Sequence, residues 1–183
     1  MAQCATVRQL TPQEAGESVG ALAEVLIDCV EGGASVSFMA PLAREKAEAF
    51  WRAVSAGVAA GTHALLVAEL HGEIVGTVHV VLGQPENQPH RANVSKMLVR
   101  RSARRQGLGA ALMRAAEEAA QRFHKTLLVL DTASQDAERL YERSGWIRVG
   151  IVPGYALLPE GGPCDTTFFY KQLAPRTAAA SPR

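Results

Sequence analysis

The chain has 183 residues, 48% of them hydrophobic, and a formal net charge of +1. The length suits one domain, and the apolar content is ample for a single core. A near-neutral charge excludes a global attraction to nucleic acid, and the apolar run at residues 19–30 contains Glu24 and Asp28 and is too short to span a bilayer. We therefore expect no nucleic-acid partner and no membrane association.

Three cysteines, Cys4, Cys29 and Cys164, are widely separated, odd in number and without the spacing of metal ligands. The N-terminus lacks the basic segment and apolar run of a secretory signal peptide. These features predict a cytoplasmic protein with reduced thiols and no bound metal. Residues 174–183 are small, polar and proline-bearing, so a disordered tail is expected after a single domain at residues 1–173.

The first predicted elements are a strand and a helix. Residues 4–10 fit a strand, and Thr11-Pro12-Gln13-Glu14 has the residues of a capping box with proline at the first helical position. The helix is expected to end at Gly32-Gly33, because glycine adopts the left-handed conformation at low cost. A short mixed loop follows at residues 34–39.

A second helix is expected to begin at Pro41 and to fray at residues 57–61. Its predicted buried stripe comprises Ala43, Ala47, Phe50, Trp51 and Val54. Residues 63–70 and 74–82 are rich in Val, Leu and Ile and are joined around His71-Gly72-Glu73, which predicts a β-hairpin. Residues 83–90 are expected to form a loop.

The second half of the chain begins with a strand at residues 93–99 and a helix that starts at Leu108. Residues 126–130 fit a buried strand that ends at Asp131, and a further helix is expected at residues 134–143. Strands are predicted at residues 146–152 and 166–173, with a turn at residues 153–155 and a loop at residues 158–164.

The segment Arg104-Arg105-Gln106-Gly107-Leu108-Gly109 stands between a strand and a helix start. Glycines at 107 and 109 remove the Cβ where a ligand must approach backbone N–H groups, and the helix points its positive end at the same place. A phosphate or pyrophosphate is the expected ligand. The alternative is a glycine loop that only turns the chain.

The order of these elements resembles the GNAT superfamily of acetyl-CoA-dependent N-acetyltransferases over roughly residues 4–173. The family's phosphate motif, Gln/Arg-x-x-Gly-x-Gly/Ala, is matched by Arg104, Gly107 and Gly109. Its later motif, Asn-x-x-Ala-x-x-Leu-Tyr, is matched by Ala137, Leu140 and Tyr141, with Ser134 where many members have asparagine. The resemblance implies an α/β (α+β) fold whose mixed, mostly antiparallel sheet has about seven strands flanked by about four helices.

Residues 32–40, 102–104, 130–132, 148–150 and 153–155 are similar to the tabtoxin resistance proteins, which are antibiotic-inactivating members of that superfamily. The chain as a whole resembles the aminoglycoside-modifying members of the same branch, the kasugamycin 2'-N-acetyltransferases. The resemblance implies N-acetylation of a small amine acceptor, an aminoglycoside such as kasugamycin first. An amino-acid toxin like tabtoxinine and protein N-termini are the alternatives. It also allows a homodimer.

By the same resemblance, acetyl-CoA binds through backbone groups of one strand and through the glycine loop. The strand residues are Met97, Leu98 and Val99, and the loop residues are Arg104, Arg105, Gln106, Gly107, Leu108, Gly109 and Ala110. Ser134 is expected to contact the cofactor in place of asparagine.

Two proton transfers need candidate residues. Tyr141 resembles the family's general acid, since a phenol with a reference pKa of ~10 is protonated at neutral pH. For the base, Asp131 is the first candidate and His79 the second, each with a structural role as the alternative. Tabtoxin resistance proteins carry glutamate where this chain has Asn93, so no catalytic carboxylate transfers to that position.

The acceptor pocket is expected between the first helix-loop-helix and the loop before the last strand. Phe38, Trp51, Tyr155 and Asp165 are the candidate acceptor contacts, with the core as the alternative place for each aromatic ring. Asp28, Glu31 and Asp165 supply acidic groups for a cationic sugar. Two other classes of function stay open, a sensor that binds acetyl-CoA without turnover and nucleic-acid binding through Arg100, Arg101, Arg104 and Arg105.

Overall fold

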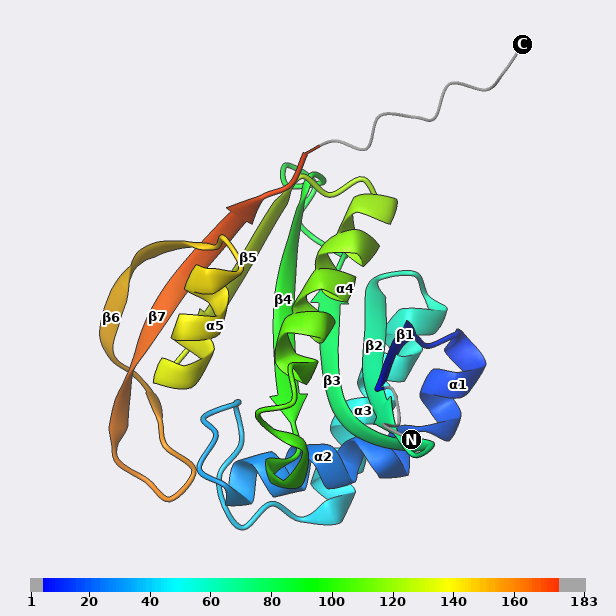
Figure 1. Ribbon diagram of the computed structural model, residues 1–183, viewed down its shortest axis with the longest axis vertical. Helices are drawn as coiled ribbons and strands as arrows, with labels where there is room; N and C mark the ends of the chain where they lie inside the picture. The colour runs from blue at the N-terminus through cyan, green and yellow to red at the C-terminus, as the bar shows by residue number, and fades with distance from the viewer. Residues whose placement is uncertain (1–4, 175–183) are drawn as a thin grey trace.

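A computed structural model describes residues 5–174, which form a seven-stranded sheet in the order β1-β2-β3-β4-β5-β7-β6 (Figure 1). Neighbouring strands are antiparallel except β4 and β5, which are parallel. The mixed, mostly antiparallel sheet predicted from the sequence is therefore confirmed.

The strands are β1 (Thr6–Gln9), β2 (His63–Leu70), β3 (Glu73–Val81), β4 (Arg91–Val99), β5 (Leu127–Thr132), β6 (Ile147–Leu157) and β7 (Pro163–Gln172). The helices are α1 (Pro12–Glu17), α2 (Val19–Glu31), α3 (Arg44–Ala59), α4 (Leu108–Arg122) and α5 (Gln135–Arg143). A 3₁₀ turn at Arg101–Ala103 connects β4 to the loop before α4.

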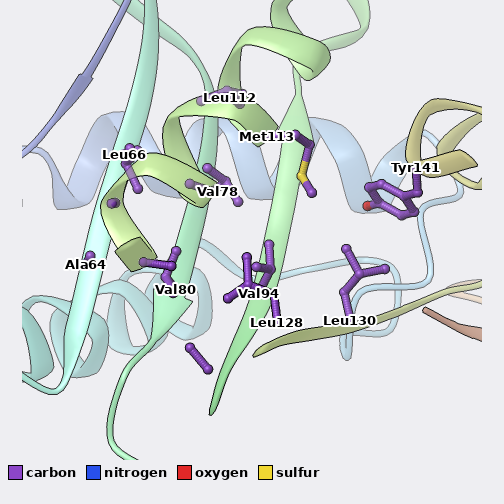
Figure 2. Close-up of a cluster of buried hydrophobic side chains, with 14 of the residues drawn as sticks. Ala64, Leu66, Val78, Val80, Val94, Leu112, Met113, Leu128, Leu130 and Tyr141 are labelled. Atoms are coloured by element: carbon purple, nitrogen blue, oxygen red, sulfur yellow. The ribbon is translucent and has the colours of Figure 1, made fainter. Parts of the chain in front are cut away.

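Two cores fill the two faces of the sheet. On one face, α4 and α5 pack against the strands through residues such as Leu112, Met113 and Tyr141 (Figure 2). On the other face, α1, α2 and α3 pack through residues such as Leu22 and Trp51. Alternate residues of β2 serve the two cores, with Leu66 in the first and Leu65 in the second, which explains the continuous apolar pattern of this strand.

The predicted first helix is two helices, so that prediction was wrong in its continuity. Thr11 and Glu14 form the expected capping box, with Glu14 N donating to Thr11 Oγ1 and Thr11 N donating to the Glu14 carboxylate. Ser18 then closes α1 and opens α2. Gly16 and Gly20 flank this break, and glycine has poor helix propensity, so little local free energy opposes it.

The second helix also differs from its prediction. Pro41 follows a cis peptide bond and lies before the helix, which begins at Arg44 with Ala43 as its exposed N-cap. Ala47, Trp51 and Val54 are buried as predicted, whereas Phe50 is partly buried. The helix ends at Ala59, within residues 57–61 where its end was expected.

The last hairpin is longer than predicted. The expected turn at residues 153–155 lies inside β6, where the register with β7 shifts between Val152 and Ala156. Asp165 accepts a hydrogen bond from Gly154 N at 2.9 Å and stabilises this irregular stretch. The expected loop at residues 158–164 is therefore shorter, because β7 begins at Pro163. Residues 175–183 of the predicted tail lie outside the described residues.

Candidate active site

The central feature of the site is the separation of β4 from β5. The two parallel strands pair only through Arg91–Asn93 and Leu127–Val129, and then diverge (Figure 1). The later residues of both strands line a cleft of about 660 Å³. Because β5 does not pair with the second half of β4, the backbone of that half can accept an extended ligand as an additional strand.

A bulge in β4 shapes the floor of this cleft. Ser95 is opposite His79 and Leu98 is opposite Thr77, so β4 contains one residue more than β3 over this interval. Lys96 lies in the bulge with a left-handed φ of +50°. A β-bulge redirects side chains, and here it places Lys96, Met97, Leu98 and Val99 on the cleft.

One end of the cleft is formed by the glycine loop and the start of α4. Gly107 is the N-cap with φ +79°, and no side chain caps the first backbone N–H groups of the helix. A Cβ built at Gly107 would project into open space, with no protein atom within 4 Å. Arg104 and Arg105 also line the cleft, so the loop has the open N–H groups and positive charge that a pyrophosphate requires.

Gly109 and Gln106 contribute differently from the sequence prediction. A Cβ at Gly109 would lie 3.1 Å from Leu140 Cδ2, so this glycine allows close packing of α4 on α5 as well as access for a ligand. Leu108, Gly109 and Ala110 line the cleft, whereas Gln106 faces a separate hollow beside His71 and Glu73. Ser134 lines the cleft, but its hydroxyl caps α5 by accepting from Ala137 N at 3.4 Å.

Tyr141 lies on α5 at the wall of the cleft, beside Leu130 and Met113 (Figure 2). Its ring packs against Trp146 and Phe169, with centroid distances of 6.0 and 5.7 Å. Burial, and the nearby carboxylate of Asp131, raise the pKa of the Tyr141 phenol. The raised pKa keeps the phenol neutral. No described residue forms a hydrogen bond with its hydroxyl, which is therefore available to a ligand.

Asp131, near the end of β5, also lines the cleft. Burial raises the pKa of its carboxyl group, and the positive charge of Lys96 opposes this shift. Asp131 is nevertheless an exposed residue, so its carboxyl group is accessible to an amine or to water. Asp131 and Tyr141 thus line the same cleft from adjoining elements.

His79, the second candidate base, does not line the cleft. It is 4% exposed in the core beneath α3, where its ring neighbours Phe50, Trp51 and His63. Burial lowers the pKa of His79 to about 3, with smaller effects of His63 and Lys96. Its surroundings are those of a neutral core histidine.

The four candidate acceptor residues do not line the cleft. Trp51 is fully buried, Tyr155 is 55% exposed on β6 against Phe168, and Asp165 supports the irregular part of β6. Phe38 is closest to the site, because the Lys96 ammonium lies 5.9 Å from its ring centroid. The acidic residues expected to contact a cationic sugar, Asp28, Glu31 and Asp165, do not line the cleft either, and Asp28 accepts from Arg101 N and Nε at 2.8 and 2.9 Å.

The predicted meeting of the first helix-loop-helix with the last hairpin does occur. Ser35 Oγ donates to Leu157 O at 3.0 Å, and Ala40 N donates to Pro159 O at 2.9 Å. These bonds hold the loop between α2 and α3 against the tip of the β6–β7 hairpin (Figure 1). Residues 33–37 of this loop line the cleft.

Lys96 is the site residue that sequence reasoning missed. Its ammonium donates to Ser37 Oγ at 3.2 Å and lies over the rings of Phe38 and Phe50. Burial lowers the pKa of Lys96, and Asp131 opposes the shift. The sequence signal was a lysine in the middle of a central strand. A charge that is buried at such a position costs free energy unless it has a partner or a function.

Residues 33–146 match the model of the acetyltransferase (GNAT) family. The chain belongs to this family. It is accordingly an acyltransferase, an acetyl-CoA-dependent N-acetyltransferase of the GNAT type.

Three solved structures illustrate the similarity of fold. A ribosomal-protein-alanine N-acetyltransferase from Brucella melitensis is 23% identical, with a TM-score of 0.76 and coverage of 92% of this chain and 99% of the other. An acetyltransferase-like protein from Salmonella typhimurium, solved with acetyl-CoA, is 20% identical, with a TM-score of 0.76 and coverage of 97% and 99%. A phosphinothricin acetyltransferase from Sinorhizobium meliloti, in complex with acetyl-CoA, is 16% identical, with a TM-score of 0.74 and coverage of 92% and 88%.

Among the helices at residues 5–174, none is long and apolar enough to cross a membrane. The arginine cluster that suggested nucleic-acid binding is largely engaged within the protein. Arg101 pairs with Asp28 at 2.9 Å, Arg105 with Asp136 at 3.2 Å, and Arg104 Nε donates to Val99 O at 3.1 Å. These contacts hold the loop beside the cleft.

Proposed function

We propose that this GNAT enzyme acetylates the amine of a small antibiotic held in the cleft between β4 and β5. The observation that carries the proposal is the joint presence of the open glycine loop, Asp131 and Tyr141 on one cleft. The phosphates of acetyl-CoA bind at the start of α4, and its extended arm pairs with the free edge of β4. The amine approaches from the side lined by the loop between α2 and α3.

The residues of the chain have three tasks in this reaction. The cleft aligns amine and thioester, and such positioning can contribute ~7–11 kcal/mol to lowering the barrier. Asp131 takes the amine proton, directly or through water, and Tyr141 donates a proton to the departing thiolate. The backbone N–H near Leu98 polarises the thioester carbonyl. Each proton transfer is worth ~10²–10⁴ in rate.

The first proposed acceptor is an aminoglycoside such as kasugamycin, from the overall resemblance of the chain to enzymes that modify it. An amino-acid toxin like tabtoxinine is the second candidate, and Lys96 favours it, because a cation in the cleft suits an acceptor with a carboxylate. Protein N-terminal acetylation is the third candidate. A cytoplasmic location agrees with all three and stays a prediction.

A mass-spectrometric assay with acetyl-CoA tests the proposal. The panel contains kasugamycin, other aminoglycosides, tabtoxinine-like amino acids and N-terminal peptides. We expect a mass increase of one acetyl group on at least one antibiotic. Turnover on peptides alone, or on no member of the panel, would refute antibiotic acetylation.

We also propose that two copies of the chain associate through β6. This edge strand is paired only with β7, and Ile147, Val149 and Ile151 are 51%, 67% and 53% exposed. The opposite edge strand, β1, is short and carries Arg8, which pairs with Glu14 and Glu69. An unprotected apolar edge favours pairing with a second copy, which sedimentation of the wild type and of Val149→Lys would measure.

A further inference from the structure

Lys96 occupies a strained position from which its side chain reaches the acceptor side of the cleft. A left-handed φ of +50° is unfavourable for a residue with a Cβ and tends to persist at functional sites. The bulge in β4 requires one extra residue, but it does not require a lysine. The ammonium lies beside Ser37 and Phe38, on the loop that lines this side of the cleft.

The ammonium has two aromatic neighbours and hydrogen-bonding capacity to spare. Its distances to the ring centroids of Phe50 and Phe38 are 5.3 and 5.9 Å, and such contacts favour the charged form. An ammonium has three donor hydrogens, and Ser37 Oγ accepts one of them at 3.2 Å. Within residues 5–174, no other hydrogen bond from Lys96 Nζ is formed, so two donors remain for a ligand.

Asp131 lies on the other diverging strand and lines the same cleft as Lys96. Each charge shifts the pKa of the other group toward its ionised form, so the two are close enough to interact. In the part of the chain that the structure describes, however, no ion pair within 4.0 Å joins them. The cleft therefore presents a separated positive and negative group, complementary to a small zwitterion.

We propose that Lys96 and Asp131 form a subsite for an acceptor that carries an acidic group next to the amine to be acetylated. The carboxylate, or an equivalent acidic group, binds Lys96 Nζ, and the amine is directed to Asp131. This inference rests on the proposed function and defines its acceptor class. It favours amino-acid-like acceptors over polycations that lack an acidic group, because Lys96 repels a second ammonium.

The experiment compares acceptor pairs that differ only in a carboxylate or a carboxamide. The probes are tabtoxinine-like amino acids, phosphinothricin and the common L-amino acids, each with its amide. They are assayed with the wild type, Lys96→Met and Lys96→Arg. Lys46→Met is the matched control, because exposed Lys46 also lies 5.9 Å from the Phe38 ring centroid but does not line the cleft.

The wild type should prefer the acid over its amide. Lys96→Met should lower kcat/KM for the acid by roughly 10- to 100-fold, mainly through the acceptor KM, and leave the amide and the acetyl-CoA KM nearly unchanged. Lys96→Arg should restore part of the preference, and Lys46→Met should behave as the wild type. Thermal unfolding of each variant checks that a loss of rate is not a loss of fold.

The outcomes separate the two proposals. Acetylation of acids and amides at equal rates, or a preference that Lys96→Met leaves unchanged, overturns the Lys96 subsite while antibiotic acetylation stands. Acetylation of polycationic aminoglycosides alone would also overturn the Lys96 subsite while antibiotic acetylation stands. No acetylation of any probe or antibiotic refutes the proposed function, and the subsite with it.

Discussion

At the scale of single residues, Tyr141 is fixed by its ring and free at its hydroxyl. Trp146 and Phe169 hold the ring, while the hydroxyl has no partner among the described residues. Burial raises the pKa of the phenol, so it stays protonated over the physiological range. This state is the one that a general acid needs before the thiolate departs.

Tyr141→Phe should therefore lower kcat by roughly 100-fold or more, because the ring packing is kept and only the proton donor is lost. Acetyl-CoA affinity, measured by calorimetry, should change little. Tyr170→Phe, on β7, serves as the matched control and should retain wild-type kcat. An unchanged kcat in Tyr141→Phe would exclude the phenol as the acid. In the wild type, a rate that falls between pH 7 and 9 because Tyr141 ionises would contradict its raised pKa.

At the scale of elements, the loop before α4 combines two requirements at one glycine. Gly107 needs a left-handed φ of +79°, and it is the N-cap of a helix whose first N–H groups are open. A side chain there would not collide with the protein, since no atom lies within 4 Å of the built Cβ. Substitutions at Gly107 can therefore test the ligand site with backbone strain as the main side effect.

Gly107→Glu should abolish acetyl-CoA binding, because its carboxylate lies against the phosphates. Gly107→Gln is the matched control with nearly the same size and strain. We expect calorimetry to detect binding by the Gln variant, weakened by strain, and none by the Glu variant. Equal affinities for the two variants would show that the phosphates bind elsewhere.

At the scale of the whole molecule, a buried histidine on the central strand β3 makes the stability of the protein depend on pH. His79 is buried beneath α3, its Nδ1 has no hydrogen-bond partner, and its pKa is lowered to about 3. In the unfolded chain a histidine titrates near pH ~6.5. Between these two values the unfolded state binds the extra proton, so the contribution of His79 to stability is present above about pH 6.5 and is lost as the pH falls toward 3.

His79→Leu should reduce this acid sensitivity. Between pH 7 and 5, we expect the wild type to lose about 2 kcal/mol more of its free energy of unfolding than the variant loses. Urea denaturation at pH 7, 6 and 5 measures the difference. His90→Gln, at an exposed histidine, should follow the wild type, and parallel curves for wild type and His79→Leu would show that His79 is not a buried neutral group.

The sequence by itself determined the local elements and one end of the site. The capping box at Thr11, the β2–β3 hairpin and the glycine loop before α4 depend on neighbouring residues, so their patterns could be read directly. The GNAT fold followed from the resemblance that these patterns carry, and the family match confirms it. The break at Ser18 and the start of α3 were missed, since helix boundaries depend weakly on local propensity.

Only the tertiary structure decided which residues face the cleft. Strand register and the separation of β4 from β5 depend on contacts between residues far apart in the chain. Those contacts buried Trp51 and His79 and turned Gln106 away. The same register produced the bulge that places Lys96 on the cleft that Asp131 also lines. A bulge of this kind can be recognised only when the partner strand is known.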